Sequence, residues 1–119
     1  DYLLFKIPNY ENVTSSKIFK YSFKNNDLIS IDFDEFIDNF ISYNNYSYFT
    51  TYNENSDISK LYKMDNNTNE IVQLQTIKGL CASLFVCSDN GTYVYEFEDC
   101  DLNYYSNEPN ASPITVVND

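Results

Sequence analysis

The residue types that carry most protein chemistry are sparse in this chain. It contains no histidine, and because acid–base and nucleophilic catalysis usually recruit histidine, Ser-His-Asp, Cys-His and histidine-based metal sites are excluded. An acidic cluster, Asp32, Asp34, Glu35 and Asp38, could supply the paired carboxylates of glycoside hydrolysis. Charge runs of this kind are usually solvated connections. We therefore expect a protein that is not an enzyme.

One oxygen-rich stretch has the spacing of a cation loop. Asp65, Asn67 and Asn69 are spaced like the first ligands of a Ca²⁺ loop, but Glu70 stands where that loop needs a glycine for its sharp turn. Asn and Asp also favour ordinary tight turns. We expect a hairpin turn here, and no metal or cofactor.

The chain has an odd number of cysteines: Cys81, Cys87 and Cys100. The pair Asn90-Gly91 favours a two-residue hairpin turn, which would place Cys81 opposite Cys100. Cys81 and Cys87 are too far apart on one extended strand to be bridged. We predict a Cys81–Cys100 disulfide. The alternatives are a bulge that moves Cys100 toward Cys87, and three reduced thiols in a cytosolic protein.

N-glycosylation triplets (Asn-x-Ser/Thr) occur five times, all in predicted loops. They begin at Asn12, Asn45, Asn66, Asn90 and Asn110. Asn45 and Asn90 occupy equivalent turns of an internal repeat, as do Asn66 and Asn110. These positions favour N-linked glycans on a secreted or cell-surface protein, with Asn110 disfavoured by Pro113. The alternative is that asparagine is simply common in turns.

The charge balance limits the partners. The formal net charge is -11, so phosphate backbones and anionic membranes are disfavoured. No apolar run approaches the roughly 20 residues of a membrane span. The first residue is Asp1 rather than methionine, which fits a processed precursor or a piece of a longer chain. We expect other protein chains as partners, and neither nucleic acid nor membrane insertion.

The elements that carry these residues are predicted to be strands of an internal repeat. Tyr, Phe, Ile and Val are abundant and suit half-buried strands. Residues Ser16–Tyr21 recur as Ser59–Met64, and Leu28–Ile31 matches Ile71–Leu74, a period of about 43 residues. Three alternating segments open the copies: Tyr2–Phe5, Tyr48–Thr51 and Tyr93–Glu96. We predict one all-β domain, residues 1–119, with antiparallel meander repeats at about 1–46, 47–91 and 92–119.

Four short strands per period are typical of β-propeller blades. The run Leu61–Glu70 resembles a motif in the blades of secreted or periplasmic propellers, and the likeness extends loosely over most of the chain. It implies an incomplete propeller of under three blades, completed by the rest of a longer protein or by other chains. The alternatives are a β-sandwich and an open stacked array.

Two functions fit these expectations. One is a structural assembly module of a surface layer, appendage or filament, which self-associates through open sheet edges. The other is a recognition module, part of a larger secreted propeller, that binds through loops and surface aromatic residues. A hydrolase fragment is a third, less favoured interpretation, because no catalytic set is visible.

Overall fold

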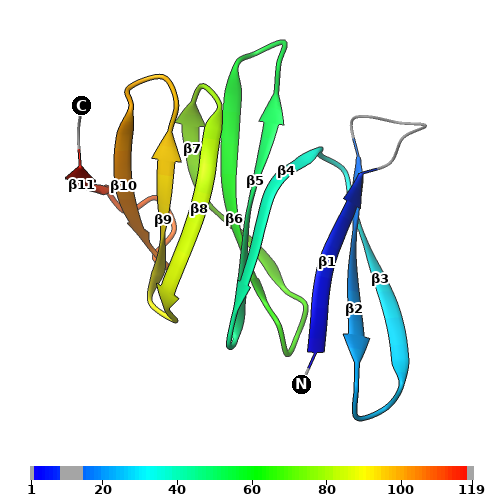
Figure 1. Ribbon diagram of the computed structural model, residues 1–119. Helices are drawn as coiled ribbons and strands as arrows, with labels where there is room; N and C mark the ends of the chain where they lie inside the picture. The colour runs from blue at the N-terminus through cyan, green and yellow to red at the C-terminus, as the bar shows by residue number, and fades with distance from the viewer. Residues whose placement is uncertain (1, 9–14, 118–119) are drawn as a thin grey trace. The chain divides into compact units, whose positions relative to one another are not determined.

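The computed structural model describes residues 2–8 and 15–117, and within them the protein is all-β without a helix. Eleven strands form three antiparallel sheets (Figure 1). The all-β prediction is confirmed. The chain divides into two compact units, residues 1–37 and 38–119, where the sequence predicted one domain.

The first unit is a three-stranded meander. Its strands are β1 (Tyr2–Pro8), β2 (Ser16–Ser22) and β3 (Asp27–Phe33), in the order β1-β2-β3. Alternate residues of β2 point to opposite faces. Ile18 is fully buried on one face, where the Ser16 hydroxyl accepts a hydrogen bond of 2.8 Å from the Ile37 amide. On the opposite face Phe5 and Phe19 stack, with ring centroids 5.2 Å apart.

The second unit contains two four-stranded meanders. The first has the order β4-β5-β6-β7, from β4 (Ile37–Tyr43), β5 (Tyr46–Asn53), β6 (Ile58–Asp65) and β7 (Ile71–Lys78). The second has the order β8-β9-β10-β11, from β8 (Cys81–Ser88), β9 (Gly91–Glu96), β10 (Asp101–Ser106) and β11 (Ile114–Val117). Asp38, the last residue of the acidic cluster, is part of strand β4.

These two sheets enclose the hydrophobic core of the second unit between their facing sides. Both contribute buried side chains, Tyr48, Leu61, Leu74 and Ile77 from one and Cys81, Leu84, Val94 and Tyr105 from the other. Burial of such side chains stabilises the unit by roughly 1.5–3 kcal/mol for each large one. Each sheet also has a second face, directed away from this core.

The sheets begin one strand earlier than the predicted repeats. They span residues 37–78 and 81–117, whereas the sequence placed boundaries at 46/47 and 91/92. The reason is that the two-residue turns Asn44-Asn45 and Asp89-Asn90 tie β4 and β8 to the strands that follow them. None of the three sheets is closed on itself.

One turn arrangement occurs in both sheets of the second unit. The Asn66 amide N–H donates to the Asn45 carbonyl at 2.8 Å, and its side-chain Nδ2 donates to the Asn44 carbonyl at 3.0 Å. Asn107 does the same to Asn90 at 3.0 Å and to Asp89 at 2.5 Å. We call these paired contacts the asparagine clasps. Asn66 therefore corresponds to Asn107, not to Asn110 as the sequence repeat suggested.

Candidate interaction surface

The face of sheet β8–β11 that points away from the core carries two cross-strand rows of side chains. Strand register places Phe85, Tyr93, Tyr104 and Ile114 in one row. The parallel row is Ser83, Tyr95, Leu102 and Val117. We call these two rows the outer face. Alternation along β9 and β10 separates it from the core, because Val94 and Tyr105 on these strands point into the core.

The outer face is apolar and open to solvent. Phe85 is 53% exposed, and Ile114 and Val117 are exposed to a similar degree. Tyr93 and Tyr104 are half-buried and contact each other, with ring centroids 5.1 Å apart. No residue of the two rows is charged, although charged residues make up 21% of the chain. An exposed aromatic face that lacks charge is typical of a binding surface.

The corresponding face of sheet β4–β7 is covered. Tyr48 follows the turn residue Asn45 at the same distance as Tyr93 follows Asn90, so the two tyrosines are equivalent. Tyr48 is fully buried against sheet β8–β11, and its hydroxyl donates to Asn107 Oδ1 at 2.7 Å. Burial raises the pKa of Tyr48 to about 12. The same face is thus covered by a sheet in one copy of the repeat and exposed in the other.

Strand β11 adds an open edge beside the outer face. It lies at the end of its sheet and pairs with β10. All four of its residues, Ile114 to Val117, are exposed. An apolar edge strand of this kind is a template for pairing with another strand.

Three of the predicted glycan acceptors lie at exposed turns. Asn45 and Asn90 are exposed in the β4–β5 and β8–β9 turns, and Asn110 is exposed between β10 and β11. Alternate connections of a meander emerge at the same end of the strands, and Figure 1 shows the β4–β5 and β8–β9 turns at the lower end. Asn12 lies outside the described residues.

Asn66 differs from the three exposed acceptors because it is buried in the fold. It is only 4% exposed, its Oδ1 accepts a 2.6 Å hydrogen bond from the Ser47 hydroxyl, and its Nδ2 donates within the clasp. A glycan would have to be attached to that same nitrogen. The folded chain uses this asparagine as an internal hydrogen-bonding group, so we expect it to carry no glycan.

The structure does not contain the predicted Cys81–Cys100 disulfide. Cys81 and Cys100 are both free thiols, and Cys81 lies opposite Glu96 instead of Cys100. The register shifts by bulges in the β8–β9 ladder, and Cys100 lies in the β9–β10 loop. Gly91 is the first residue of strand β9 and not a turn residue. Burial raises the pKa of Cys81 to about 11, which keeps its thiol protonated and unreactive near neutral pH.

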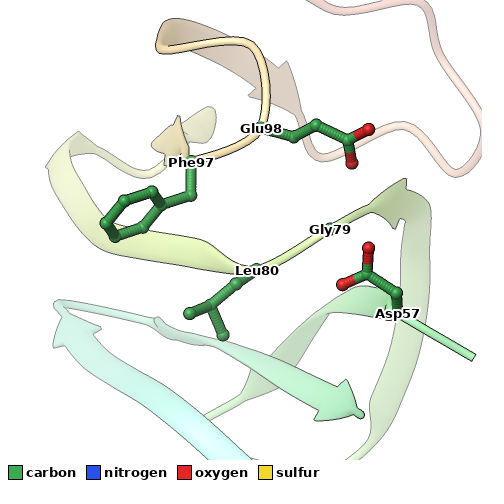
Figure 2. Close-up of a pocket in the computed structure, with 5 residues that line it drawn as sticks. All are labelled: Asp57, Gly79, Leu80, Phe97 and Glu98. Atoms are coloured by element: carbon green, nitrogen blue, oxygen red, sulfur yellow. The ribbon is translucent and has the colours of Figure 1, made fainter. Parts of the chain in front are cut away.

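A shallow hollow at the other end of the second unit is lined by Asp57, Gly79, Leu80, Phe97 and Glu98. Figure 2 shows the Leu80 and Phe97 side chains on one side of it and the two carboxylates on the other. Asp57 accepts a 2.7 Å hydrogen bond from the Tyr52 hydroxyl, and Glu98 pairs with Lys78 at 3.3 Å. Both carboxylates therefore have partners within the second unit.

Two of the acidic residues singled out by sequence, Asp32 and Asp65, interact with nearby groups of the fold. Asp32 forms an exposed ion pair with Lys17 at 3.0 Å. The Asp65 carboxylate accepts hydrogen bonds from the backbone of Asn67 at 2.8 Å and Thr68 at 3.2 Å, which stabilises a tight turn. Residues 2–8 and 15–117 hold no cluster of three or more potential metal-ligating side chains.

The outer face was not identified from sequence. Its aromatic residues were visible as Tyr-rich strands, but strand register decides which of them share a face. Comparison with protein families, with curated proteins and with solved structures finds no match to this chain. Across the described ranges, no helix is long and apolar enough to cross a membrane.

Proposed function

We propose that this chain is a non-enzymatic assembly module of a secreted or cell-surface protein, and that the outer face is the surface through which it joins other protein chains. One observation carries the proposal: the same face is covered by a neighbouring sheet in β4–β7 and exposed in β8–β11. The exposed face of β8–β11 is apolar and uncharged, as expected for one side of a protein interface.

The size of the outer face suits a modest, repeated contact. Four strands about 4.8 Å apart and about six residues long, at ~3.3 Å each, give roughly 400 Å². Two such faces together bury less than the roughly 1,200 Å² of a standard stable interface. A single contact is therefore weak, and strong assembly depends on many contacts or on added pairing at the β11 edge.

N-linked glycans are compatible with this arrangement. The acceptors that remain exposed, Asn45, Asn90 and Asn110, lie in connections at the strand ends and not in the rows of the outer face. Sugars there would cover the ends of the strands and leave the outer face accessible. A glycosylated module with one bare apolar face fits a surface layer, appendage or filament.

The test is sedimentation velocity of the purified chain over a range of concentrations. Phe85→Ser removes a half-exposed ring from the outer face, and burial of that remaining surface is worth about 1–1.5 kcal/mol, so the association constant should fall about tenfold. Phe97 is the matched control, because it is 59% exposed but lies in the β9–β10 loop. Phe97→Ser should associate like the wild type. Equal association of both variants and the wild type, or a wild type that stays monomeric at every concentration, would contradict the proposal.

A second candidate is a recognition module within a larger β-propeller. It is favoured by the order of strands in β4–β7 and β8–β11, since a four-stranded meander is also the blade unit of propellers. In that case, further sheets of a longer chain cover the outer face. Full-length material from the native source would then be a monodisperse monomer that binds a ligand through its loops.

A further inference from the structure

We infer that the occupant of the outer face is the first sheet, β1–β3, of a second copy of this chain, docked through the face that carries Phe5 and Phe19. This inference rests on the proposed function, since it names the partner of the same surface.

The second unit itself contains a covered copy of this face. In β4–β7 this face is covered by the inward face of sheet β8–β11. That inward face carries Val94 and Asn103, which lie opposite each other on the central strands β9 and β10. The required occupant is therefore a meander sheet that presents the equivalent positions of its own central strands.

The internal repeat locates the equivalent central-strand positions in the first sheet. The match of Ser16–Tyr21 to Ser59–Met64 aligns Phe19 with Tyr62. The clasp residues Asn66 and Asn107 are equivalent, so the residues four positions before them, Tyr62 and Asn103, are equivalent as well. Phe19 therefore lies on the face of its sheet that corresponds to the inward face of β8–β11. In register, Phe5 stands opposite Phe19, as Phe49 stands opposite Tyr62.

That face of the first sheet is largely apolar and includes exposed side chains. Its cross-strand rows are Leu3, Tyr21 and Leu28, then Phe5, Phe19 and Ser30, then Ile7, Lys17 and Asp32. Leu3, Ile7 and Leu28 are all more than 40% exposed. The single charged row is an ion pair of Lys17 with Asp32, so it adds no net charge. In a chain of formal charge -11, both faces can meet without adding repulsion at the contact.

The two surfaces of this contact differ, so each copy offers one of each kind. A heterologous contact of this type builds either a closed ring or an open filament. Two copies that close on each other would combine six sheets, within the roughly four to eight of closed propellers. Larger numbers give a filament.

The experiment blocks each surface in a different variant. Phe85→Lys places a charge on the outer face, and Leu28→Glu places one on the first sheet, where Leu28 is 54% exposed. Each variant alone should associate at least tenfold more weakly than the wild type in sedimentation velocity. An equimolar mixture retains one intact outer face and one intact first-sheet face, and it should form a one-to-one heterodimer within about threefold of the wild-type affinity. The control mixes Phe97→Lys with Leu28→Glu. Phe97→Lys keeps both faces intact, so it should associate with itself and with the intact outer face of Leu28→Glu, and no other pairing is expected.

The outcomes separate this inference from the proposed function. If Phe85→Lys weakens association and Leu28→Glu does not, the outer face is the assembly surface but its partner is a different surface, and the inference is overturned. The same holds if both variants weaken association and their mixture stays monomeric. If neither variant differs from the wild type, the proposed function itself fails. A second pair, Ile114→Lys with Leu3→Glu, repeats the test at other exposed positions of the same faces, so that a folding defect in one variant cannot decide it.

Discussion

Replacing Asn66 by alanine should destabilise the second unit, because its side chain is the centre of a buried clasp. It accepts from the Ser47 hydroxyl at 2.6 Å and donates to the Asn44 carbonyl at 3.0 Å and the Ser42 hydroxyl at 3.3 Å. A hydrogen bond contributes about 0.5–1.5 kcal/mol net, and a buried group left without its partner costs about 1–3 kcal/mol. Asn66→Ala should therefore lower the free energy of unfolding by about 2–4 kcal/mol.

Thr68→Ala is the matched control. It destroys the same glycosylation triplet but leaves the Asn66 side chain in place. Thr68 is exposed, and its hydroxyl accepts only a 3.3 Å hydrogen bond from the Glu70 amide, so its loss should cost about 0.5 kcal/mol. Urea unfolding followed by circular dichroism, with protein made in a host that does not glycosylate, measures both.

A clear result depends on the difference between the two variants. If Asn66→Ala is no less stable than Thr68→Ala, the clasp does not stabilise the sheet. If both variants are indistinguishable from the wild type without glycans but lose stability in glycosylated material, Asn66 carries a sugar and the buried arrangement is wrong. Mass spectrometry of glycosylated protein should find Asn45 and Asn90 occupied and Asn66 bare.

Three further predictions concern titration, thiols and glycine. Burial raises the pKa of Cys81 from 9.0 to about 11 and of Tyr48 from 10.0 to about 12, so the folded state holds these protons longer than the unfolded chain does. Stability is fully present below pH 9 and should fall by up to about 5 kcal/mol between pH 9 and 12. Tyr48→Phe should flatten the upper part of that fall in urea titrations. Iodoacetamide should modify the exposed Cys100 rapidly and Cys81 only on unfolding, and peptide mapping without reduction should find no bond between them; a recovered Cys81–Cys100 peptide would refute the register of the β8–β9 ladder. Gly91→Ala should cost about 1–3 kcal/mol in thermal unfolding, because its new Cβ would lie 2.3 Å from the Tyr105 carbonyl oxygen; wild-type stability would mean that β9 and β10 are farther apart.

Strand positions could be predicted because the alternation of apolar and polar residues is visible in the sequence. Ser16–Tyr21 and Tyr48–Thr51 each lie within one strand, as their patterns predicted. Turn chemistry was less informative, since it depends on the surroundings. Asn90-Gly91 has the composition of a tight turn, yet Gly91 is needed in β9 because Tyr104 and Tyr105 approach its backbone closely.

The candidate surface could not be predicted for a different reason. A one-residue bulge exchanges the faces of every following side chain, and sequence does not reveal where bulges lie. The turn lies at Asp89-Asn90 instead of Asn90-Gly91, and the ladder shifts twice more, between Phe85 and Ser88 and between Cys81 and Ser83. Together these changes place Cys81 opposite Glu96 and not Cys100. Likewise, the burial of Asn66 depends on Ser47 and Asn44 arriving from another hairpin, a long-range contact that the triplet Asn66-Asn67-Thr68 does not encode.

The two sheets of the second unit meet through unlike faces, and this gives their stack a direction. A directional contact repeats by rotation and translation along an axis. Each added sheet therefore contributes one more interface of the same energy, as in a one-dimensional lattice. Nothing in such a lattice fixes its own length. An assembly built on this contact therefore stops growing only when it closes into a ring or when a terminal sheet exposes a polar face.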